Sequence, residues 1–245
     1  MFDYKEDVEN FCFEIEKCSQ RGERVLSVVD LIKVRTISVK QASFLLEKIK
    51  NESSFIVGAL PSGGGKTTVM QALLCFLPPG IKIIHTENEK ILERGKDIKK
   101  SCFLCHEIGA GYYYSYLWGE SLLRFFQLKK YGHIIVSNIH ADNLQQAKNQ
   151  ICYENPVPEE LFYSVDLYIF LKVEGYGWNY KRKIDTIWVK EGNGLKKFDE
   201  TEYESKGKYL FFLQKTVSDN IFLIQDFRKE FLKTFYSDEK DKFQI

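Results

Sequence analysis

The sequence has no long apolar run and almost no excess of charge of either sign. Its 245 residues include 35 Lys and Arg against 34 Asp and Glu, which leaves a formal net charge of +1. Such a balance disfavours nucleic acid or anionic lipid as a partner held by the overall field. The longest apolar stretches, such as FIVGAL, have strand length, far below the ~20 residues that a membrane helix needs. We therefore expect no membrane span.

The chain also lacks the marks of an exported protein. Its start, MFDYKEDVENF, is acidic and has neither the basic region nor the apolar core of a secretory signal. Six cysteines in 245 residues are too sparse for the disulfide framework of a small secreted domain. With 44% hydrophobic and 28% charged residues, the composition is that of an ordinary soluble globular protein. A cytoplasmic protein with reduced thiols is expected.

One cysteine pair, Cys102 and Cys105, precedes His106 and matches the C-x-x-C-H pattern of covalent haem attachment. The pattern lies in an apolar run typical of a strand, where alternation places the two cysteines on opposite faces. The sequence offers no second cysteine pair with the spacing of zinc ligands. We therefore predict neither a haem nor a structural zinc site here.

Periodicity divides the chain into three segments. Residues 1–52 have apolar positions at helical spacing, with Ser38 as the N-cap of a second helix, and predict a short helical N-terminal extension. Residues 53–200 alternate short aliphatic runs with helical stretches, which indicates an α/β core with a mainly parallel sheet. Residues 201–245 predict a C-terminal helical segment and a solvated tail.

Within the α/β segment we expect strands separated by helices. The strands are expected near 55–60, 81–86, 102–108, 133–140, 166–173 and 183–190. The helices are expected at 66–77, 118–131 and 142–153, with a last amphipathic helix at 219–236. The turn-like sequence GYGWN joins the last two strands and predicts an antiparallel C-terminal β-hairpin.

A glycine-rich turn after the first expected strand carries the strongest chemical signal. The segment FIVGALPSGGGKTT gives strand, turn and helix in succession, which is the context of a phosphate-binding P-loop. The glycines of 63–65 let backbone N–H groups converge on phosphate oxygens, while Lys66 offers a cation and the Thr67 hydroxyl is a ligand for Mg²⁺. The predicted nucleotide-binding residues are Ser62, Gly63, Gly64, Gly65, Lys66, Thr67 and Thr68. The alternative is a glycine-rich turn that binds nothing.

Two acidic residues follow expected strands. Glu87 comes after IKIIHT, and Glu107 comes after SCFLCH. A P-loop enzyme needs carboxylates near the γ-phosphate to hold Mg²⁺ through water and to orient or deprotonate the attacking water. Strand ends are where such groups lie, although position alone equally allows two surface acids.

Four segments in the same order resemble the type II/type IV secretion, pilus-assembly and archaellum ATPases. Beside the phosphate loop, TEN at 86–88 resembles the family's acidic box, and HEI at 106–108 resembles the segment with its Walker B glutamate. GHIIVSNIH at 132–140 resembles the histidine box, Gly-His-Leu-Val-x-Ser-Thr-Leu-His, at the same spacing. VVDLIKVRTISVKQASFLLEKI at 28–49 resembles the helix, turn and helix before the phosphate loop in archaeal members, and Arg182 and Lys183 resemble the family's basic pair. The resemblance therefore covers about residues 25–195.

This resemblance implies a RecA-like ATPase core that binds and hydrolyses ATP with Mg²⁺. It implies that the carboxylates of Glu107 and Glu87 are catalytic and that Glu107 also binds the metal beside Thr67. It further implies that His140 is a catalytic residue that senses the γ-phosphate. Without the resemblance, a histidine at a strand end is more often a capping residue. His133 is expected to pack, with Gly132 as a helix C-cap.

The resemblance also implies partners. The family works as a homo-oligomeric ring, for which a hexamer is one form, and acts on a membrane-embedded secretion or pilus platform protein. The cytoplasmic protein would then lie at the inner face of the membrane through that partner rather than through a span of its own.

Several positions depart from the family pattern. Leu60 stands where the P-loop has its first glycine, Asn88 where the acidic box often has Asp, and Gly109 where the Walker B segment has Arg. The segment 109–119 is longer than its counterpart, and the large N-terminal domain is reduced to residues 1–52. Two alternatives stay open: a regulatory nucleotide-binding subunit with little turnover, and a P-loop phosphotransferase that uses 109–119 as a lid.

An aromatic cluster and three short basic clusters are interpreted as packing residues and as solvated surface. The aromatic residues of 112–118 could form a partner surface or a platform for a nucleotide base, but packing is the commoner role of such a cluster. The basic clusters at 99–100, 129–130 and 181–183 are short, and we interpret them as solvated rather than as a nucleic-acid surface.

Overall fold

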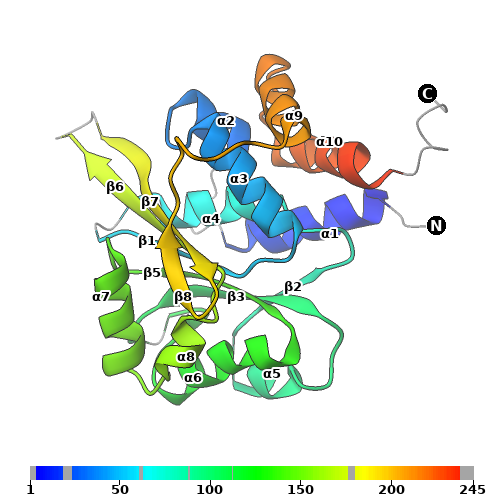
Figure 1. Cartoon of the computed structure of the whole chain (residues 1–245). Helices are drawn as coiled ribbons and strands as arrows, with labels where there is room; N and C mark the ends of the chain where they lie inside the picture. The colour runs from blue at the N-terminus through cyan, green and yellow to red at the C-terminus, as the bar shows by residue number, and fades with distance from the viewer. Residues whose placement is uncertain are drawn as a thin grey trace. The chain divides into compact units, whose positions relative to one another are not determined.

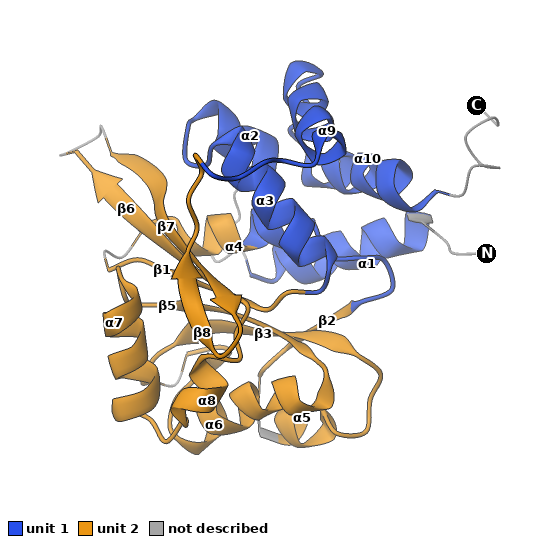
Figure 2. Cartoon of the chain, in the orientation of Figure 1, with its two compact units in different colours: residues 1–52, 71–81, 202–245 blue, residues 53–70, 82–201 orange. Residues whose placement is uncertain are grey.

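The computed structural model describes residues 4–18, 24–60, 63–87, 89–111, 113–175 and 180–237 (Figure 1). The chain forms two compact units, which Figure 2 shows in different colours. Unit 1 contains residues 1–52, 71–81 and 202–245, and unit 2 contains residues 53–70 and 82–201. The predicted three-part domain division stays a prediction.

Unit 2 is built on a sheet that has eight strands in the described residues, in the order β2-β3-β5-β1-β6-β7-β8, with β4 paired to β3. The strands are β1 (Phe55–Gly58), β2 (Lys82–His85), β3 (Ser101–Ile108), β4 (Tyr116–Leu117), β5 (Ile134–Ile139), β6 (Leu167–Glu174), β7 (Lys181–Glu191) and β8 (Gly194–Lys197). Strands β1 to β6 pair in parallel, and β7 and β8 continue the sheet antiparallel. The prediction of an α/β fold with a mainly parallel sheet and a C-terminal β-hairpin is confirmed, and this architecture is consistent with a RecA-like core.

The strand order brings the predicted chemical residues to one edge of the sheet. Strand β5 lies between β1 and β3, with Val57 opposite Asn138 and Leu104 opposite Val136. All residues of β1, β3 and β5 are buried, as expected for parallel strands covered on both faces. Because these strands run in the same direction, their carboxyl ends meet, and a ligand crevice of an open α/β sheet forms at such ends.

Helices of unit 2 cover one side of this sheet (Figure 1). They include α5 (Glu89–Arg94), α6 (Glu120–Gln127), α7 (Leu144–Lys148) and α8 (Glu159–Phe162). Phe125 of α6 and Leu161 of α8 belong to the same buried cluster as Phe103 and Ile135 of the sheet. This core packs against β3 and β5 and so positions their carboxyl ends, where the predicted site residues lie.

The expected helices are present with shorter bounds. α4 is Lys66–Leu74 rather than 66–77. The helix expected at 118–131 is α6 followed by a 3₁₀ turn, Leu128–Tyr131. Gly132 ends that turn with φ of 81°, a left-handed conformation that glycine adopts without a steric cost. The predicted C-cap is confirmed.

Some short elements were not expected from the sequence. The helix predicted at 142–153 is α7 joined to a π-helical turn, Asn149–Tyr153. Elements α5, α8, β4 and β8 have six residues or fewer, too few for a helical or strand period to be visible. The hairpin turn predicted at GYGWN lies largely outside the described residues, which end at 175 and resume at 180.

Unit 1 is helical. Its helices are α1 (Tyr4–Glu16), α2 (Val28–Lys33), α3 (Val39–Lys50), α9 (Gly207–Ser218) and α10 (Ile224–Tyr236), together with the end of α4. Ser38 is the N-cap of α3 as predicted, because its Oγ accepts from the Gln41 N–H at 3.0 Å. The prediction of one helix over 219–236 was wrong at its start, since α9 precedes it and a turn with Asn220 at φ 56° separates the two.

A buried arginine ties together three parts of unit 1. Arg228 of α10 is 1% exposed, and its Nη2 lies 2.8 Å from Oδ1 of Asp7 in α1. Its Nη1 donates to the carbonyls of Cys75 (3.1 Å) and Leu77. The guanidinium also lies 4.6 Å from the centre of the Phe11 ring.

None of the helices in the described parts of the chain is long and apolar enough to cross a membrane.

Candidate nucleotide-binding site

The phosphate loop has the backbone that its glycines allow. Gly63 and Gly65 have φ of 76° and 89°, in the left-handed region that non-glycine residues rarely adopt. A Cβ on Gly63 would meet no atom within 4 Å, so the space in front of this residue is open. Helix α4 begins directly after the loop, and its first N–H groups have no carbonyl partner within the helix. Ser62, also predicted to bind nucleotide, lies outside the described residues.

Glycine is also required before the loop. A Cβ on Gly58, the last residue of β1, would lie 2.5 Å from the Ala141 carbonyl oxygen and 2.6 Å from the Phe170 ring. The neighbouring strands could not approach β1 this closely around a larger residue. The motif's usual first glycine stands two positions later, where this chain has Leu60 with 47% of its surface exposed.

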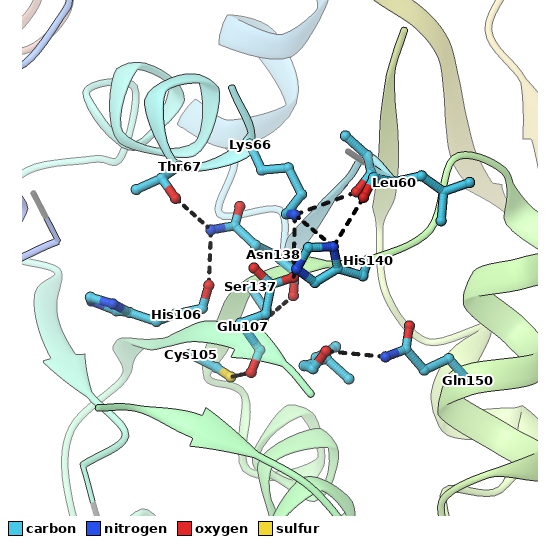
Figure 3. Close-up of polar contacts among 12 residues, drawn as sticks. Leu60, Lys66, Thr67, Cys105, His106, Glu107, Ser137, Asn138, His140 and Gln150 are labelled. Atoms are coloured by element: carbon cyan, nitrogen blue, oxygen red, sulfur yellow. Dashed lines mark hydrogen bonds and ion pairs between the residues drawn. The ribbon is translucent and has the colours of Figure 1, made fainter. Parts of the chain in front are cut away.

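Lys66 is buried but loosely held. Its Nζ lies 3.4 Å from the Ala59 carbonyl oxygen, 3.4 Å from Nδ1 of His140 and 3.6 Å from Oε1 of Glu107 (Figure 3). Hydrogen bonds of an ammonium to a carboxylate are usually near 2.8 Å, so none of these contacts is at full strength. Burial lowers the pKa of Lys66, and the carboxylate of Glu107 opposes that shift. Among the residues that the structure describes, the cation therefore has no short partner of its own.

Glu107 stands near the end of β3 with its carboxyl group facing Lys66 and His140 (Figure 3). Oε1 is buried and has no hydrogen bond to any of the described residues, and it lies 3.8 Å from Nε2 of His140. Burial raises the pKa of Glu107, while the charges of Lys66 and His140 oppose the rise. A carboxylate with a raised pKa and a free lone pair is suited to accept a proton from water.

His140 follows β5 and reaches the phosphate loop. Its Nδ1 lies 3.3 Å from the Leu60 carbonyl oxygen as well as 3.4 Å from Lys66 Nζ. A carbonyl can only accept, whereas an ammonium can only donate, so Nδ1 cannot satisfy both at once. Nε2 faces Glu107, and the side chain is 41% exposed. The imidazole is thus linked to the loop, the lysine and the carboxylate.

Asn138, two residues before His140, joins the loop helix to β3. Its Nδ2 donates to the His106 carbonyl oxygen at 2.9 Å and lies 3.3 Å from Oγ1 of Thr67. No role for this residue was predicted from the sequence. The available signal was an amide side chain in the histidine box, at the position where the family's motif has threonine.

Arg182 of β7 also contacts the phosphate loop. Its Nε donates to the Gly63 carbonyl oxygen at 3.0 Å, and its Cδ lies 3.0 Å from where a Cβ on Gly65 would stand. Gly65 is therefore constrained twice, by its φ and by this close approach. Its neighbour Lys183 pairs instead with Glu174 at 2.9 Å. Of the predicted basic pair, Arg182 is the member that the structure places at the loop.

Glu87 is held away from these groups. It follows β2, its carboxyl group is exposed, and Oε1 accepts from the Tyr114 hydroxyl at 2.5 Å. Tyr114 belongs to the segment 109–119 that is longer than in the resembling family. Within the described ranges, no contact joins Glu87 to Lys66, Glu107 or His140. Asn88, the other departure in the acidic box, is not among those ranges.

Two histidines flanking the site have other environments. His133 Nδ1 accepts from the Ser101 N–H at 3.1 Å, and its Nε2 lies 2.5 Å from the Gly95 carbonyl oxygen, so its predicted packing role is confirmed. Burial, helped by His85, lowers the pKa of His106 to about 4, which keeps that imidazole neutral.

Cys105 in β3 donates to the carbonyls of Glu107 and Ser115, and burial raises the pKa of its thiol to about 12.

The groups present fit a nucleotide with Mg²⁺. The loop offers N–H donors, a left-handed turn and open space at Gly63 for phosphate oxygens. The hydroxyl of Thr67 and the buried acceptor atoms of Glu107 and Asn138 are oxygen ligands or partners of bound water, which a hard cation prefers. Donors on one side and oxygen acceptors on the other match the charge pattern of a metal-bound polyphosphate.

Comparison with known proteins gives a structural likeness. No protein-family model matches the chain, and no curated protein matches it. Among solved structures, the chain is similar to the VirB11 ATPase of the Brucella suis type IV secretion system, with 19% identity and a TM-score of 0.49 over 66% of this chain. It is also similar to the Legionella pneumophila ATPase DotB, with 10% identity and a TM-score of 0.42 over 85% of this chain. The matched parts span 55% of the first and 65% of the second.

Proposed function

We propose that this chain binds ATP with Mg²⁺ and hydrolyses it. The observation that carries the proposal is that Lys66, Glu107 and His140 converge from three different segments. They do so beside a loop in which two glycines have the left-handed backbone conformation. In a turn that binds no ligand, a lysine and a carboxylate buried together would be destabilising. The free energy of removing both charges from water exceeds the attraction gained at their separation of 3.6 Å. A bound polyphosphate supplies the missing partner for the cation.

Each residue then has a defined task. Lys66 turns from Glu107 to the phosphate and neutralises charge that develops there. The Thr67 hydroxyl and a water held by Glu107 would ligate Mg²⁺, which supplies Lewis-acid stabilisation of the phosphate oxygens. Once Lys66 has moved, the Glu107 carboxylate is free to orient and deprotonate the attacking water. His140, which contacts the loop at Leu60, would report the presence of the γ-phosphate.

We further propose that the active form is a cytoplasmic homo-oligomer, such as a ring, which serves a membrane-embedded platform protein. The support is the sequence resemblance together with the exposed edge of the site at His140, where a neighbouring subunit could contribute a cation. Arg182 already provides one within the chain. Turnover that depends on protein concentration would support an active site completed by a neighbour.

A regulatory subunit that binds nucleotide with little turnover is the second candidate. The observation that favours it is the Glu87–Tyr114 contact of 2.5 Å, which engages the acidic-box carboxylate outside the site. This contact engages the Glu87 carboxylate with Tyr114 rather than with Lys66, Glu107 or His140, to which no contact joins it in the described residues. Under this alternative Glu107 organises the metal but no group completes the hydrolytic site.

The test is Mg²⁺-dependent ATP turnover over a range of protein concentrations, with nucleotide affinity measured in parallel. Glu107→Gln is expected to keep nucleotide affinity within a few fold and to lower turnover by about 10²- to 10³-fold, as for loss of a general base. Lys66→Ala is expected to lose both. Lys96→Ala and Glu191→Gln, at exposed positions, are the matched controls. Binding without turnover at any concentration would reject the hydrolase and leave the regulatory subunit.

A further inference from the structure

Asn138 has one amide atom that the folded protein leaves without a partner. Among the described residues, Oδ1 of Asn138 is one of the few buried polar side-chain atoms with no hydrogen bond. The residue is 1% exposed, so bulk water does not solvate this oxygen. A buried acceptor that stays unsatisfied is destabilising, and native proteins keep such atoms mainly where a ligand or ordered water uses them.

The orientation of the amide follows from its neighbours. Nδ2 lies 2.9 Å from the His106 carbonyl oxygen, and a carbonyl can only accept a hydrogen bond. Exchanging the two amide atoms would set Oδ1 against that carbonyl and place two acceptors in contact. The amide nitrogen therefore faces His106 and Thr67, and Oδ1 is the atom that is left over. Figure 3 shows the side chain lying between Thr67 and Lys66.

We propose that Asn138 is a positioning residue for Mg²⁺: its Nδ2 holds the Thr67 hydroxyl in place while its Oδ1 accepts from a water bound to the metal. This inference rests on the proposed nucleotide site and assigns a role in it that neither the motif nor the comparisons give. The Thr67 Oγ1 has two lone pairs, and the contact with Nδ2 at 3.3 Å uses one of them. The other lone pair stays available to a cation.

The Asn138 amide would thus act on two ligands of the same ion: Nδ2 orients the Thr67 hydroxyl, and Oδ1 accepts from a metal-bound water. Mg²⁺ keeps several of its waters in protein sites, and each bound water is a strong hydrogen-bond donor that needs an acceptor. Oδ1 shares its amide carbon with Nδ2, so it lies beside the Thr67 hydroxyl and can receive such a water. Because Asn138 is 1% exposed, a water can reach Oδ1 only when side chains around the loop shift, and a bound nucleotide would draw them into new contacts. Metal affinity should therefore appear only together with nucleotide.

The experiment titrates Mg²⁺ at a fixed, subsaturating concentration of a fluorescent non-hydrolysable ATP analogue and follows binding by anisotropy. For Asn138→Ala, the Mg²⁺ concentration at half-maximal binding should rise about 10-fold, as is usual when a partner of a metal ligand is removed. Binding of the analogue in EDTA should match the unmutated protein. Without nucleotide, neither protein should bind Mg²⁺ in this range.

Asn155→Ala is the matched control. Asn155 is also buried, its Oδ1 accepts from the Gly119 N–H at 2.6 Å and its Nδ2 donates to the Gln150 carbonyl oxygen at 2.7 Å. Removing this amide should lower the unfolding midpoint without moving the Mg²⁺ midpoint. If Asn138→Ala does not fold, Asn138→Val is the second variant. Its β-branched side chain suits a strand and offers neither a donor to Thr67 nor an acceptor for bound water.

Three results would overturn the proposal. An unchanged Mg²⁺ midpoint in both Asn138 variants would show that Oδ1 has no metal-bound partner. An equal loss of analogue binding with and without Mg²⁺ would show a purely structural role. If the unmutated protein fails to bind the analogue at all, the proposed function itself is wrong, which separates that failure from one of Asn138 alone.

Discussion

Two buried cations in this chain have opposite surroundings. Arg228, in unit 1, has short contacts on every side, with Asp7 at 2.8 Å and the Cys75 carbonyl at 3.1 Å, and the Leu77 carbonyl also accepts from it. Lys66, in unit 2, has contacts of 3.4 to 3.6 Å. Both side chains are almost completely buried, so exposure alone does not distinguish them.

The difference separates a structural charge from the charge of the proposed nucleotide site. A buried charge whose donors all have close acceptors is committed to the fold, since any ligand would have to break those contacts first. A buried charge with long contacts, beside buried oxygens without partners, has been desolvated without being compensated. That state is costly unless a ligand relieves it, and active sites are where such groups gather.

The largest expected effect is on the structural centre. Arg228→Met should lower the free energy of unfolding by about 3 kcal/mol, because it leaves the Asp7 carboxylate and two backbone carbonyls without their donor. Denaturant unfolding followed by circular dichroism measures this. Arg24→Met is the control: Arg24 is 44% exposed at its ion pair with Asp30, so its loss should cost below about 1 kcal/mol. Equal effects of the two substitutions would contradict the structural assignment of Arg228.

The same substitution at the other centre should spare the fold and remove binding. Lys66→Met is expected to change the free energy of unfolding by about 1 kcal/mol or less. The lysine's contact with Glu107 is long, its own desolvation cost disappears, and the buried Glu107 carboxyl group, whose pKa is already raised, can take up a proton. Affinity for ATP should fall by about 10- to 100-fold through loss of a charge-assisted contact. Unfolding curves and nucleotide titration of the same sample test both parts. A loss of stability as large as that for Arg228→Met would remove the contrast between the two centres.

More of the candidate nucleotide site than of the buried Arg228 centre could be named from the sequence. Lys66 and Thr67 follow from a local pattern, because the phosphate loop is a contiguous segment between a strand and a helix. Glu107 and His140 were named from separate motifs, and the parallel strand order then brings their ends together. The core fold was likewise predictable, since buried strands and amphipathic helices each leave a periodic signal.

The other features depend on contacts that no local pattern encodes. Arg228 binds Asp7 at a separation of 221 positions, and neither residue differs in its local sequence from a solvated surface charge. The Glu87–Tyr114 contact depends on how the segment 109–119 folds, and that segment has neither a helical nor a strand period. Asn138 was visible in the histidine box, but the importance of its Oδ1 appears only once the partners of Nδ2 are known.

A smaller effect, on pH dependence, tests whether Lys66 and Glu107 compensate each other at all. Burial raises the pKa of Glu107 above its ordinary value of 4.5, and Lys66 limits the rise. A carboxyl group whose folded-state pKa is raised binds its proton more tightly in the folded protein, so its contribution to stability is greatest below pH 4.5 and is lost as pH rises through the raised pKa. Without Lys66 the rise is larger, and so is the loss.

Unfolding of Lys66→Met between pH 4 and pH 7 should therefore show a fall in free energy of about 1 kcal/mol relative to the unmutated protein. Adding Glu107→Gln in the same background should abolish that fall, because the amide does not titrate. The comparison of the single and double variants cancels the contributions of all other titrating groups. Parallel pH profiles for the two would mean that Glu107 is solvated in the absence of nucleotide, and the contrast with Arg228 would then rest on distances alone.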